Sequence, residues 1–594
     1  MKKLLLIIAV LLGCIAMSAQ PRSEQQAKQI ASEFFKKKPL QKAPMLSVVP
    51  QQKVSQTINK KMARSKASPA QHSAYYIIND DANNRFVIVS SDERLYEILG
   101  YSDNGCFDAE KAPVALIELI DGYDHEYSAL LNSGYTESIS SEYETVDSIP
   151  YFVKSTWGQD EPYNLHCPLD IKGRHSVTGC VATAMAQTMN YYHYPNQTKG
   201  GTIRYKAPSL GCYESFDYST YSINWNNIED TYNESCTETQ KQEVAKLMHA
   251  CGVSVYMDYD SISNANSYNI PYALIKNFGF NANTYFVDRD YYDIKEWHKM
   301  MRKELKAKRP ILYGGHGMGG HRFIIDGINT QGLYHINFGW DGDCDGWFSI
   351  DAIHPYGDFY ALFLNAHFNN DQSMVIGVSK ETIDESHDVF YVDKIKLDTL
   401  SHINTNTSIS CDEDSYYFCY GNKVNSQISD TYTIGVGVFD ENWQLLKSLD
   451  RYTYSFKFGL GIKRNFSVKY DAATFTEGSQ YYIALYAQHK YSSKPTIIRT
   501  QYGKQDWYRA TTKDGQVYLE RKRLIDTISV IPPRPVIPEG PVGDYVVYAS
   551  DRSGNGVTWQ VVCIKDTEDS TKYYIKGLDP TLSKEAVSNT VHGL

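Results

Sequence analysis

The sequence predicts an α+β protein with a β-rich C-terminal part. Apolar residues recur at helical spacing over 23–37 and 112–132, and β-rich runs of Tyr, Phe, Val and Ile occupy 75–79 and 86–90. Beyond residue 370, short Val/Ile/Tyr-rich stretches are divided by Gly, Asn, Asp and Ser, a spacing typical of β-sandwiches. At 594 residues the chain is too long for one ordinary domain.

Residues 1–19 have the pattern of a secretory signal peptide. Lysines precede the apolar run Leu4 to Leu12, and the small residues Ser18-Ala19 close it. An alternative makes Cys14 the lipidated cysteine of a lipobox, which the bulky Leu12 disfavours. No later stretch approaches the roughly 20 consecutive apolar residues of a membrane helix. We therefore expect a secreted protein with no transmembrane span.

Residues 20–147 are expected to form a small α+β unit. Ser23 suits the N-cap of the first helix, and residues 38–72 are polar, basic and poor in aromatics, which predicts a flexible linker. The polar stretch 80–84 separates the two β-rich runs and indicates a hairpin. The helix over 112–132 then ends the unit.

The C-terminal part divides at a proline-rich stretch. Residues 371–531 are expected to form a β-sandwich-like domain. Residues 532–541 predict a stiff linker, and residues 542–594 a small β module.

Charge and cysteine content exclude some classes of function. The formal net charge of -10 is mild, and no Lys/Arg block marks a surface for nucleic acid. Ten cysteines remain apart from Cys14. If Cys180 is a free nucleophile, at least one other cysteine stays unpaired, while Cys411 and Cys419 could bridge a hairpin.

Cys180 lies in the mixed helix and strand pattern of residues 148–370. Apolar residues at three- and four-residue steps after it place Cys180 in the first turn of a buried helix. Unpaired N–H groups and the helix dipole at that position lower a thiol's pKa. The alternative is an inert buried cysteine or half of a disulfide, which is commoner for an isolated cysteine in a secreted chain.

A histidine that could take the thiol's proton follows 141 residues later. His321 comes after two glycines and before the alternating Phe323 and Ile325, so we expect it at the start of a strand. His316 in the same loop is a rival, and a solvated strand-end histidine is the other interpretation. The long separation suits catalytic groups that meet only in the fold.

Asn337 is expected on the next strand, beside His321 in an antiparallel pair. An amide there can accept the ring N–H and fix the imidazole's tautomer, completing the Cys, His, Asn order of a thiol protease. Trp340 could cover that hydrogen bond from water, although a core tryptophan explains it equally well.

Gln159 suits a second oxyanion donor. Its side-chain amide would work with the backbone N–H of Cys180 on the scissile carbonyl oxygen. On its own, the glutamine could equally be an ordinary surface residue.

Residues 341–346 match the first half of a calcium loop. The loop's twelfth position is Ala352 in place of a bidentate Glu, and the surroundings have strand character. We therefore favour a turn between strands, with no metal.

These residues together resemble the streptopain-like cysteine proteases, a family of secreted papain-like enzymes. Four separate motifs carry the resemblance in the same order: Thr178–Ala184 with Tyr194-Pro195 behind it, Gly252–Tyr259, Gly320–Gly327 and His335–Trp340. The resemblance covers roughly residues 20–370.

The resemblance implies a papain-like protease domain at 148–370, with no cofactor, and roles for five residues. Cys180 would be the nucleophile, His321 the base, Asn337 the orienting residue, Trp340 a supporting aromatic and Gln159 the oxyanion residue. Residues 20–147 would be an inhibitory prodomain, released by cleavage between about Ser133 and Val153.

Two departures from the family pattern concern substrate choice and packing. Asp260 stands where the family typically has Gly, in the loop 260–266 that shapes the pocket for the residue before the cleaved one. This weakens the hydrophobic preference that the family implies there. Phe338 stands where some relatives carry Trp, a change that both apolar aromatic rings should tolerate.

The sequence thus favours a secreted cysteine endopeptidase made as a zymogen, acting through an acyl-enzyme. Its partners would be protein or peptide substrates, host proteins among them, and its own prodomain. A second hypothesis is a surface adhesin acting through its C-terminal β modules, suggested by the 48 tyrosines. A third is an inactive homologue or an inhibitor, against which all five expected catalytic positions are filled.

Overall fold

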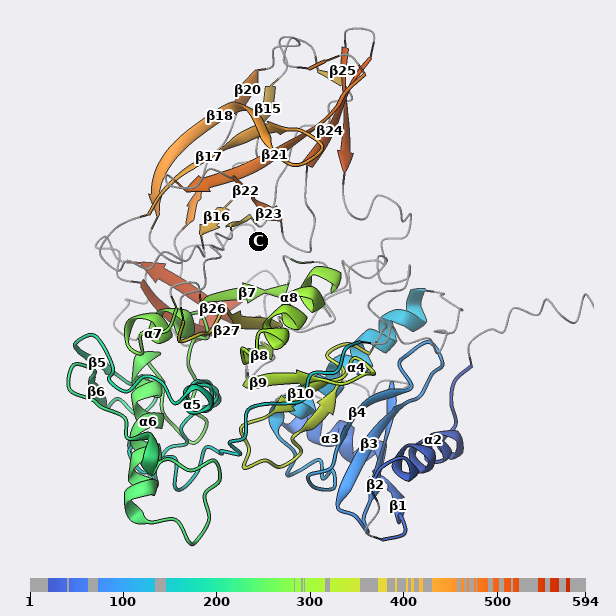
Figure 1. Ribbon diagram of the computed structural model, residues 1–594, viewed down its shortest axis with the longest axis vertical. Helices are drawn as coiled ribbons and strands as arrows, with labels where there is room; N and C mark the ends of the chain where they lie inside the picture. Colours follow the sequence, from blue (N-terminus) through green and yellow to red (C-terminus); the bar gives the residue numbers. More distant parts are fainter. Residues whose placement is uncertain are drawn as a thin grey trace, which may run out of the picture. The chain divides into compact units, whose positions relative to one another are not determined.

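In the computed structural model, residues 20–381 form most of the described structure (Figure 1). The described residues are 20–39, 42–61, 73–133, 146–281, 284–289, 292, 294–315, 321–352, 372–381, 390–392, 402–403, 408–410, 416–419, 430–456, 461–463, 467–469, 475–476, 478–489, 495–500, 507–513, 516–522, 543–550, 556–565 and 573–576. The expected signal peptide, Cys14, His316, Cys411 and the proline-rich linker lie outside them. No helix within the described residues is long and apolar enough to cross a membrane.

The N-terminal unit is an antiparallel sheet with helices packed on it (blue in Figure 1). Ser23 caps the first helix as predicted, in a capping box with Gln26. The predicted hairpin is formed by β2 and β3, and the predicted second long helix is α4. The elements are α2 (Glu24–Lys36), β1 (Leu46–Val48), α3 (Gln51–Lys61), β2 (Tyr75–Asp80), β3 (Arg85–Ser90), β4 (Ile98–Ser102) and α4 (Val114–Ser133).

The prediction of a flexible linker over 38–72 is wrong where β1 and α3 form, between Leu46 and Lys61. Strand β1 pairs with β2, and helix α3 follows it directly. Val54 and Ile58 are buried one turn apart in the core beneath α3, with Thr57 beside them. Because the rest of α3 is Gln, Lys, Ser and Asn, its average composition hid this narrow apolar stripe.

The middle domain shares one sheet with the N-terminal unit. The ten strands run in the order β1-β2-β3-β4-β11-β10-β9-β8-β12-β7. Strand β4 joins β11 in an antiparallel pair, with Tyr101 opposite Trp347 and Gly100 opposite Phe348. The sheet also includes β12, so the middle domain extends past the expected boundary at 370 to at least Ile376.

The elements of the middle domain alternate helix and strand in the order expected for an α+β fold. They are α5 (Cys180–Tyr192), β5 (Thr202–Lys206), β6 (Tyr213–Asp217), the 3₁₀ turn η1 (Trp225–Asn227), α6 (Glu238–Ser254), α7 (Asn269–Lys276), β7 (Tyr285–Asp288), α8 (Ile294–Lys306), β8 (Ile311–Gly315), β9 (His321–Ile328), β10 (Tyr334–Asn337), β11 (Gly346–Phe348) and β12 (Ser373–Ile376). Helices α5, α6 and α7 are green in Figure 1.

The two faces of the sheet bury two separate cores. One core contains α4 and α8, with Phe323 and Ile325 of β9. The other contains α5 and α6, with Ile324 of the same strand. Successive side chains of a strand point to opposite faces, so β9 contributes alternately to both cores. We call them the α4 face and the α5 face.

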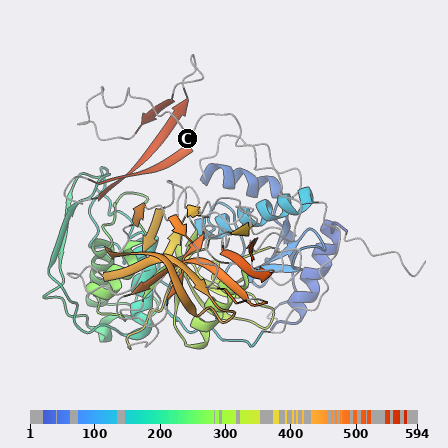
Figure 2. The same ribbon diagram turned by 90° about the horizontal axis from the view of Figure 1, so that it is seen from above.

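The C-terminal part is built from strands, as predicted, and the α+β class is confirmed for the chain. The expected strands at 432–439 and 481–488 are β17 and β21, in a sheet ordered β14-β25-β24-β21-β17-β18 (orange in Figures 1 and 2). A second sheet is ordered β19-β16-β13-β23. The strands are β13 (Phe390–Val392), β14 (His402–Ile403), β15 (Ser408–Ser410), β16 (Tyr416–Cys419), β17 (Asp430–Phe439), β18 (Leu445–Phe456), β19 (Gly461–Lys463), β20 (Ser467–Lys469), β21 (Gln480–His489), β22 (Thr496–Ile497), β23 (Arg499–Thr500), β24 (Trp507–Lys513) and β25 (Gln516–Lys522).

Residues 530–594 form a separate unit. Its described elements are β26 (Gly543–Ser550), β27 (Gly556–Lys565) and β28 (Tyr573–Lys576), paired as an antiparallel three-stranded sheet.

Candidate active site

Helix α5 begins at Cys180, as the sequence predicts. Its N-cap, Gly179, has a φ of 84°, a backbone conformation that side chains other than glycine rarely adopt. A Cβ at this position would also lie 2.7 Å from the sulfur of Met257. Glycine therefore allows both the turn into the helix and the close approach of the 257–263 loop.

Gln159 lies on a segment bound to the residues before Cys180. The backbone N–H of Thr178 donates to the carbonyl oxygen of Gln159 at 3.0 Å. The hydroxyls of Thr178 and Thr183 are 2.9 Å apart and hold this loop against the first turn of α5. Gln159 itself is half-buried, and its backbone lies beside the residues that lead into the helix.

Strand β9 brings the second candidate to Cys180. The backbone N–H of Arg322 donates to the sulfur of Cys180 at 3.3 Å, and His321 is the preceding residue at the start of the strand. The chain segments of Cys180 and His321 therefore meet. Among the described residues, however, the ring of His321 makes no hydrogen bond to Cys180 or Asn337.

His321 shares the α4 face with Phe323 and Ile325, because residues two apart in a strand point the same way. Burial, together with the nearby positive charge of Lys61 on α3, lowers the pKa of His321 to about 4. The imidazole is therefore neutral at physiological pH while α3 and α4 are in place.

The pKa of the Cys180 thiol is raised, contrary to the expectation for a helix N-terminus. Burial is the largest cause, and the negative charge of Glu118 on α4 adds to it. The N–H groups of Arg322 and Val181 and the charge of Arg322 act in the opposite direction but do not outweigh burial. The sequence argument considered the helix alone, without the segment that covers its end.

Asn337 lies on β10, which pairs with β9 as predicted, but it stands opposite Ile324 and not beside His321. Its side chain is nearly fully buried and fully engaged. The Nδ2 group donates to the carbonyl oxygen of Ser155 at 2.7 Å, and Oδ1 accepts from Gln187 Nε2 at 3.0 Å and from the N–H of Gly339 at 3.1 Å. The expected bond to the ring of His321 is not present in this arrangement.

Gln187 is a residue that the sequence reasoning missed. It lies seven residues after Cys180 on the same face of α5, and it also accepts from the N–H of Trp157 at 3.2 Å. A buried polar side chain two turns after Cys180 was the signal that could have revealed it.

Trp340 is half-buried and packs on the α4 face, in the segment that links β10 to β11. The preferred turn at 341–346 is confirmed, because these residues connect the two paired strands. Asp345 there accepts the N–H of Phe338 at 2.8 Å, and burial raises its pKa to about 7.

The N-terminal unit is bonded to the end of β11 by both backbone and side chains. The N–H of Ser349 donates to Leu99, and that of Cys344 donates to Asn104. Beyond the strand, Glu126 on α4 accepts the N–H of Ala352 at 2.8 Å. The unit thus covers the α4 face close to His321.

Two family descriptions match the chain. Residues 157–348 match the peptidase C10 family, and residues 19–127 match the Spi protease inhibitor family. Streptopain of Streptococcus pyogenes is 36% identical over 318 residues, which cover 49% of this chain and 78% of streptopain. The chain belongs to the peptidase C10 family. This C10 peptidase is a streptopain-like cysteine endopeptidase made as a zymogen, and its N-terminal unit is the inhibitory prodomain.

Other proteins are similar to part of this chain. The thiol protease/hemagglutinin PrtT of Porphyromonas gingivalis is 29% identical over 398 residues, covering 64% of this chain and 44% of PrtT. A prointerpain A fragment of Prevotella intermedia has a TM-score of 0.46 and 29% identity, covering 52% of this chain and 97% of the fragment. Active interpain A has a TM-score of 0.35 and 34% identity, covering 40% and 99%.

Proposed function

We propose that Cys180 is the nucleophile of this C10 peptidase and that His321 is its general base. The observation that carries the proposal is the 3.3 Å hydrogen bond between the backbone N–H of Arg322 and the sulfur of Cys180. Two segments 141 residues apart in sequence meet there, and the residue next to the bond is a histidine.

The reaction follows from these two groups. The thiolate of Cys180 attacks the peptide carbonyl carbon, and the electron pair of the C=O bond moves onto oxygen. The N–H of Cys180 and the amide of Gln159 stabilise that oxyanion, and imidazolium at His321 gives its proton to the leaving amine. Water, deprotonated by the same imidazole, then hydrolyses the thioester.

Asn337 and Trp340 are proposed to support the imidazole in the processed enzyme. Gln187 and Ser155 hold the Asn337 amide at one orientation. In the processed enzyme its Oδ1 would accept a ring N–H in place of one of its two present donors, Gln187 Nε2 or the N–H of Gly339. For that bond to form, His321 must turn from its place near Lys61. Release of the prodomain removes Lys61 and Glu118, which supports this step.

Activation is proposed to cut the chain between Ser133 and Ile149. Helix α4 ends at Ser133, and Ile149 exchanges two backbone hydrogen bonds of 2.7 and 2.9 Å with Ile328 of β9. Just beyond, Asp326 accepts the N–H groups of Phe152 and Val153. Bonds from Ile149 to Val153 are therefore held on the sheet and are poor targets for cleavage.

The loop 260–266 is proposed to shape the pocket for the residue before the cleaved one. Ser263 donates to the carbonyl oxygen of Val177 at 2.6 Å, and the N–H of Val177 lies 3.3 Å from the carbonyl oxygen of Asp260. The loop is thus fixed three residues from Cys180. A hydrophobic preference is supported by the apolar side chain of Met257, which lies against Gly179, in line with the family.

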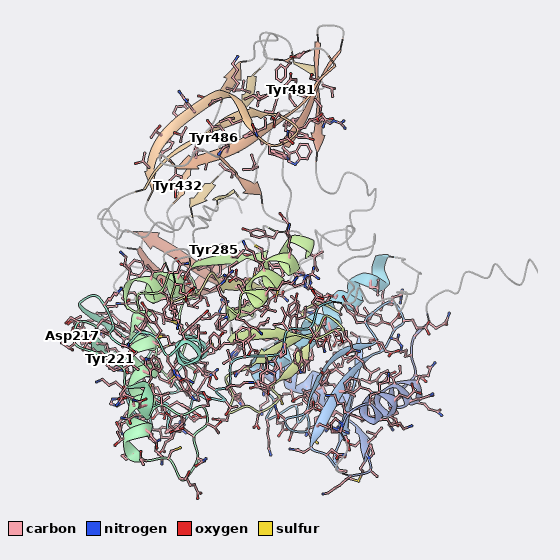
Figure 3. The ribbon with its side chains drawn as sticks, viewed as in Figure 1. Asp217, Tyr221, Tyr285, Tyr432, Tyr481 and Tyr486 are labelled. Atoms are coloured by element: carbon pink, nitrogen blue, oxygen red, sulfur yellow. The ribbon has the colours of Figure 1, made fainter. Side chains whose placement is uncertain are left out.

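Export through residues 1–19 and action on proteins outside the cell, including host proteins, remain part of the proposal. The adhesin alternative is not favoured. The labelled strand tyrosines Tyr432, Tyr481 and Tyr486 are all buried (Figure 3), so these members of the tyrosine-rich set serve packing in the sheet and offer no binding surface.

The test is covalent labelling by an epoxide inhibitor of papain-like enzymes, read by peptide mapping. Wild type should carry one adduct, on Cys180, after the prodomain is lost, and His321→Ala should reduce it strongly. Cys236→Ala is the matched control, because Cys236 is also a half-buried free thiol and should not affect labelling. An adduct confined to another cysteine would overturn the proposal.

A further inference from the structure

Arg322 is a buried cation on the α5 face, next to the nucleophile. Only 2% of its surface is exposed. Its guanidinium donates through Nη1 to the carbonyl oxygens of Leu312 and Ser373, both at 3.1 Å, and through Nη2 to the hydroxyl of Ser373 at 3.0 Å. All of these acceptors are neutral.

The sheet is shaped to hold this side chain. Arg322 on β9 stands opposite Gly314 on β8, which stands opposite Ser373 on β12. A Cβ at position 314 would lie 3.2 Å from the Cζ of Arg322. Because glycine leaves that place open, the guanidinium lies across β8 and reaches the third strand.

The guanidinium has no carboxylate partner within the part of the chain that the structure describes. Its Nε is buried without a hydrogen-bond acceptor, and the ring of Phe286 lies 5.8 Å away. A buried charge that meets only neutral groups is costly, and proteins ordinarily pair such a charge or remove it. Burial accordingly lowers the pKa of Arg322 to about 10, where it still carries its proton at neutral pH.

The groups near enough to act on this charge are Cys180, Tyr268 and Tyr313. Burial raises the pKa of Tyr313 well above its usual range. Cys180 is also bonded through its sulfur to the backbone of Arg322 itself. Of these groups, Cys180 is the one whose ionised form the proposed reaction uses, so its thiolate, when it forms, is the anion that this cation is placed to meet.

We propose that Arg322 is an electrostatic partner of the Cys180 thiolate, so that the nucleophile is stabilised by a fixed cation on the α5 face as well as by the imidazolium of His321. Arg322 is a positioning residue, since its side chain acts through the field at sulfur and touches no reacting atom. The inference rests on the proposed role of Cys180 and adds a second source of positive charge to it.

The fixed charge of Arg322 and the movable charge of His321 would act at different stages of activation. In the precursor the imidazole is neutral and lies on the α4 face, so the charge of Arg322 is the one that favours thiolate. When the prodomain leaves, His321 completes the pair. The nucleophile would then need only the histidine's movement to become reactive.

The test measures carboxamidomethylation of Cys180 by iodoacetamide in the full-length precursor from pH 6 to 10, mapped by peptide. Arg322→Met removes the charge and keeps an apolar side chain of similar length. We expect the midpoint for Cys180 to rise by about one pH unit, a roughly tenfold slower reaction below the midpoint. Arg322→Lys should keep most of the wild-type value.

The melting temperature separates this role from a purely structural one. Arg322→Met replaces an unpaired buried charge with an apolar side chain, so it should leave the melting temperature unchanged or raise it, whereas loss of a purely structural arginine would lower it. Ser373→Ala is the matched control: it removes one guanidinium acceptor and should lower the melting temperature with little effect on the midpoint. The buried Cys167 and Cys251 report any opening of the structure, because they should stay unmodified throughout.

The proposal is overturned if Arg322→Met leaves the Cys180 midpoint at the wild-type value, or moves it only together with labelling of Cys167 and Cys251. This failure differs from failure of the proposed function. In the latter case the epoxide would not label Cys180 in processed wild type, whatever the midpoint in the precursor.

Discussion

The two faces of strand β9 surround Cys180 and His321 with different groups. On the α5 face, Cys180 meets the N–H and the charge of Arg322, both of which favour thiolate. On the α4 face, His321 meets Lys61, which disfavours imidazolium. The α5 face belongs wholly to the protease and is already built, whereas the α4 face is completed by the prodomain. The prodomain therefore acts on both groups, through Lys61 on His321 and through Glu118 on Cys180.

The largest effect should come from the α5 face, in the loss of the nucleophile. Cys180→Ala should lower kcat/KM for a protein substrate by a factor on the order of 10⁴ or more, because no other group can form the thioester. Hydrolysis of a casein-type substrate by the processed enzyme measures this. Cys236→Ala should retain wild-type activity, and equal losses in both variants would contradict the assignment.

The next largest effect should come from Gln187 on α5, which holds the side chain of Asn337 on β10. Gln187→Ala removes a donor from Asn337 Oδ1 and frees the amide to turn, so kcat should fall by roughly 10- to 100-fold with a smaller change in KM. Steady-state kinetics on one peptide substrate separate the two constants. Gln242→Ala, at an exposed position of α6, is the control. A rise in KM with kcat unchanged for Gln187→Ala would argue against a positioning role.

On the α4 face we expect acid to destabilise the precursor through His321. Its pKa is about 4 in the fold and about 6.5 when unfolded, so the unfolded chain binds more protons as pH falls from 6.5 to 4. The loss should reach up to about 3 kcal/mol at pH 4. Asp124 and Asp345, whose pKa burial raises to about 7, act with the opposite sign over this range.

The contribution of His321 to the stability of the precursor is obtained by comparing two variants. Urea unfolding of the Cys180→Ala precursor, which cannot process itself, should be compared with Cys180→Ala/His321→Phe between pH 4 and 7. The gap between the two should change in favour of the phenylalanine variant as pH falls. Parallel curves would mean that His321 titrates normally in the precursor.

The smallest effect should come from Lys61, which is half-buried and donates to the carbonyl oxygen of Ala112 at 2.8 Å. Lys61→Met removes the charge near His321, so the midpoint of its acid transition should rise by a few tenths of a pH unit. The ring proton shifts of His321 in NMR spectra report this directly. Lys60→Met, on the neighbouring residue, should have less effect, and an equal shift would rule out a specific contact.

The sequence predicted where Cys180, His321 and Asn337 lie on helix and strand, because local patterns determine those positions. The apolar spacing after Cys180 fixed the start of α5, and the alternation after His321 fixed the start of β9. The turn that ends at Gly332 fixed β10 and hence Asn337. These are local features of helices, strands and turns, and the residues concerned follow the usual periodicities.

What could not be predicted depends on contacts between distant segments. The amide of Asn337 turns to Gln187 and Ser155, and no local pattern encodes that choice. An arginine within a strand suggests a solvent-facing side chain, but Gly314 and Ser373 on two other strands make room for Arg322 inside. The raised pKa of Cys180 likewise depends on a segment that ends long before it in the chain.

The junction between β4 and β11 has a consequence for the processed enzyme. Only two residue pairs join the prodomain strand to the protease sheet, and before cleavage the intact chain keeps the two sides at a high effective concentration. Once the connection is cut, the same contacts become a bimolecular association that obeys mass action. Whether the severed prodomain continues to inhibit then depends on the concentration of the two pieces, so dilution alone would release the enzyme.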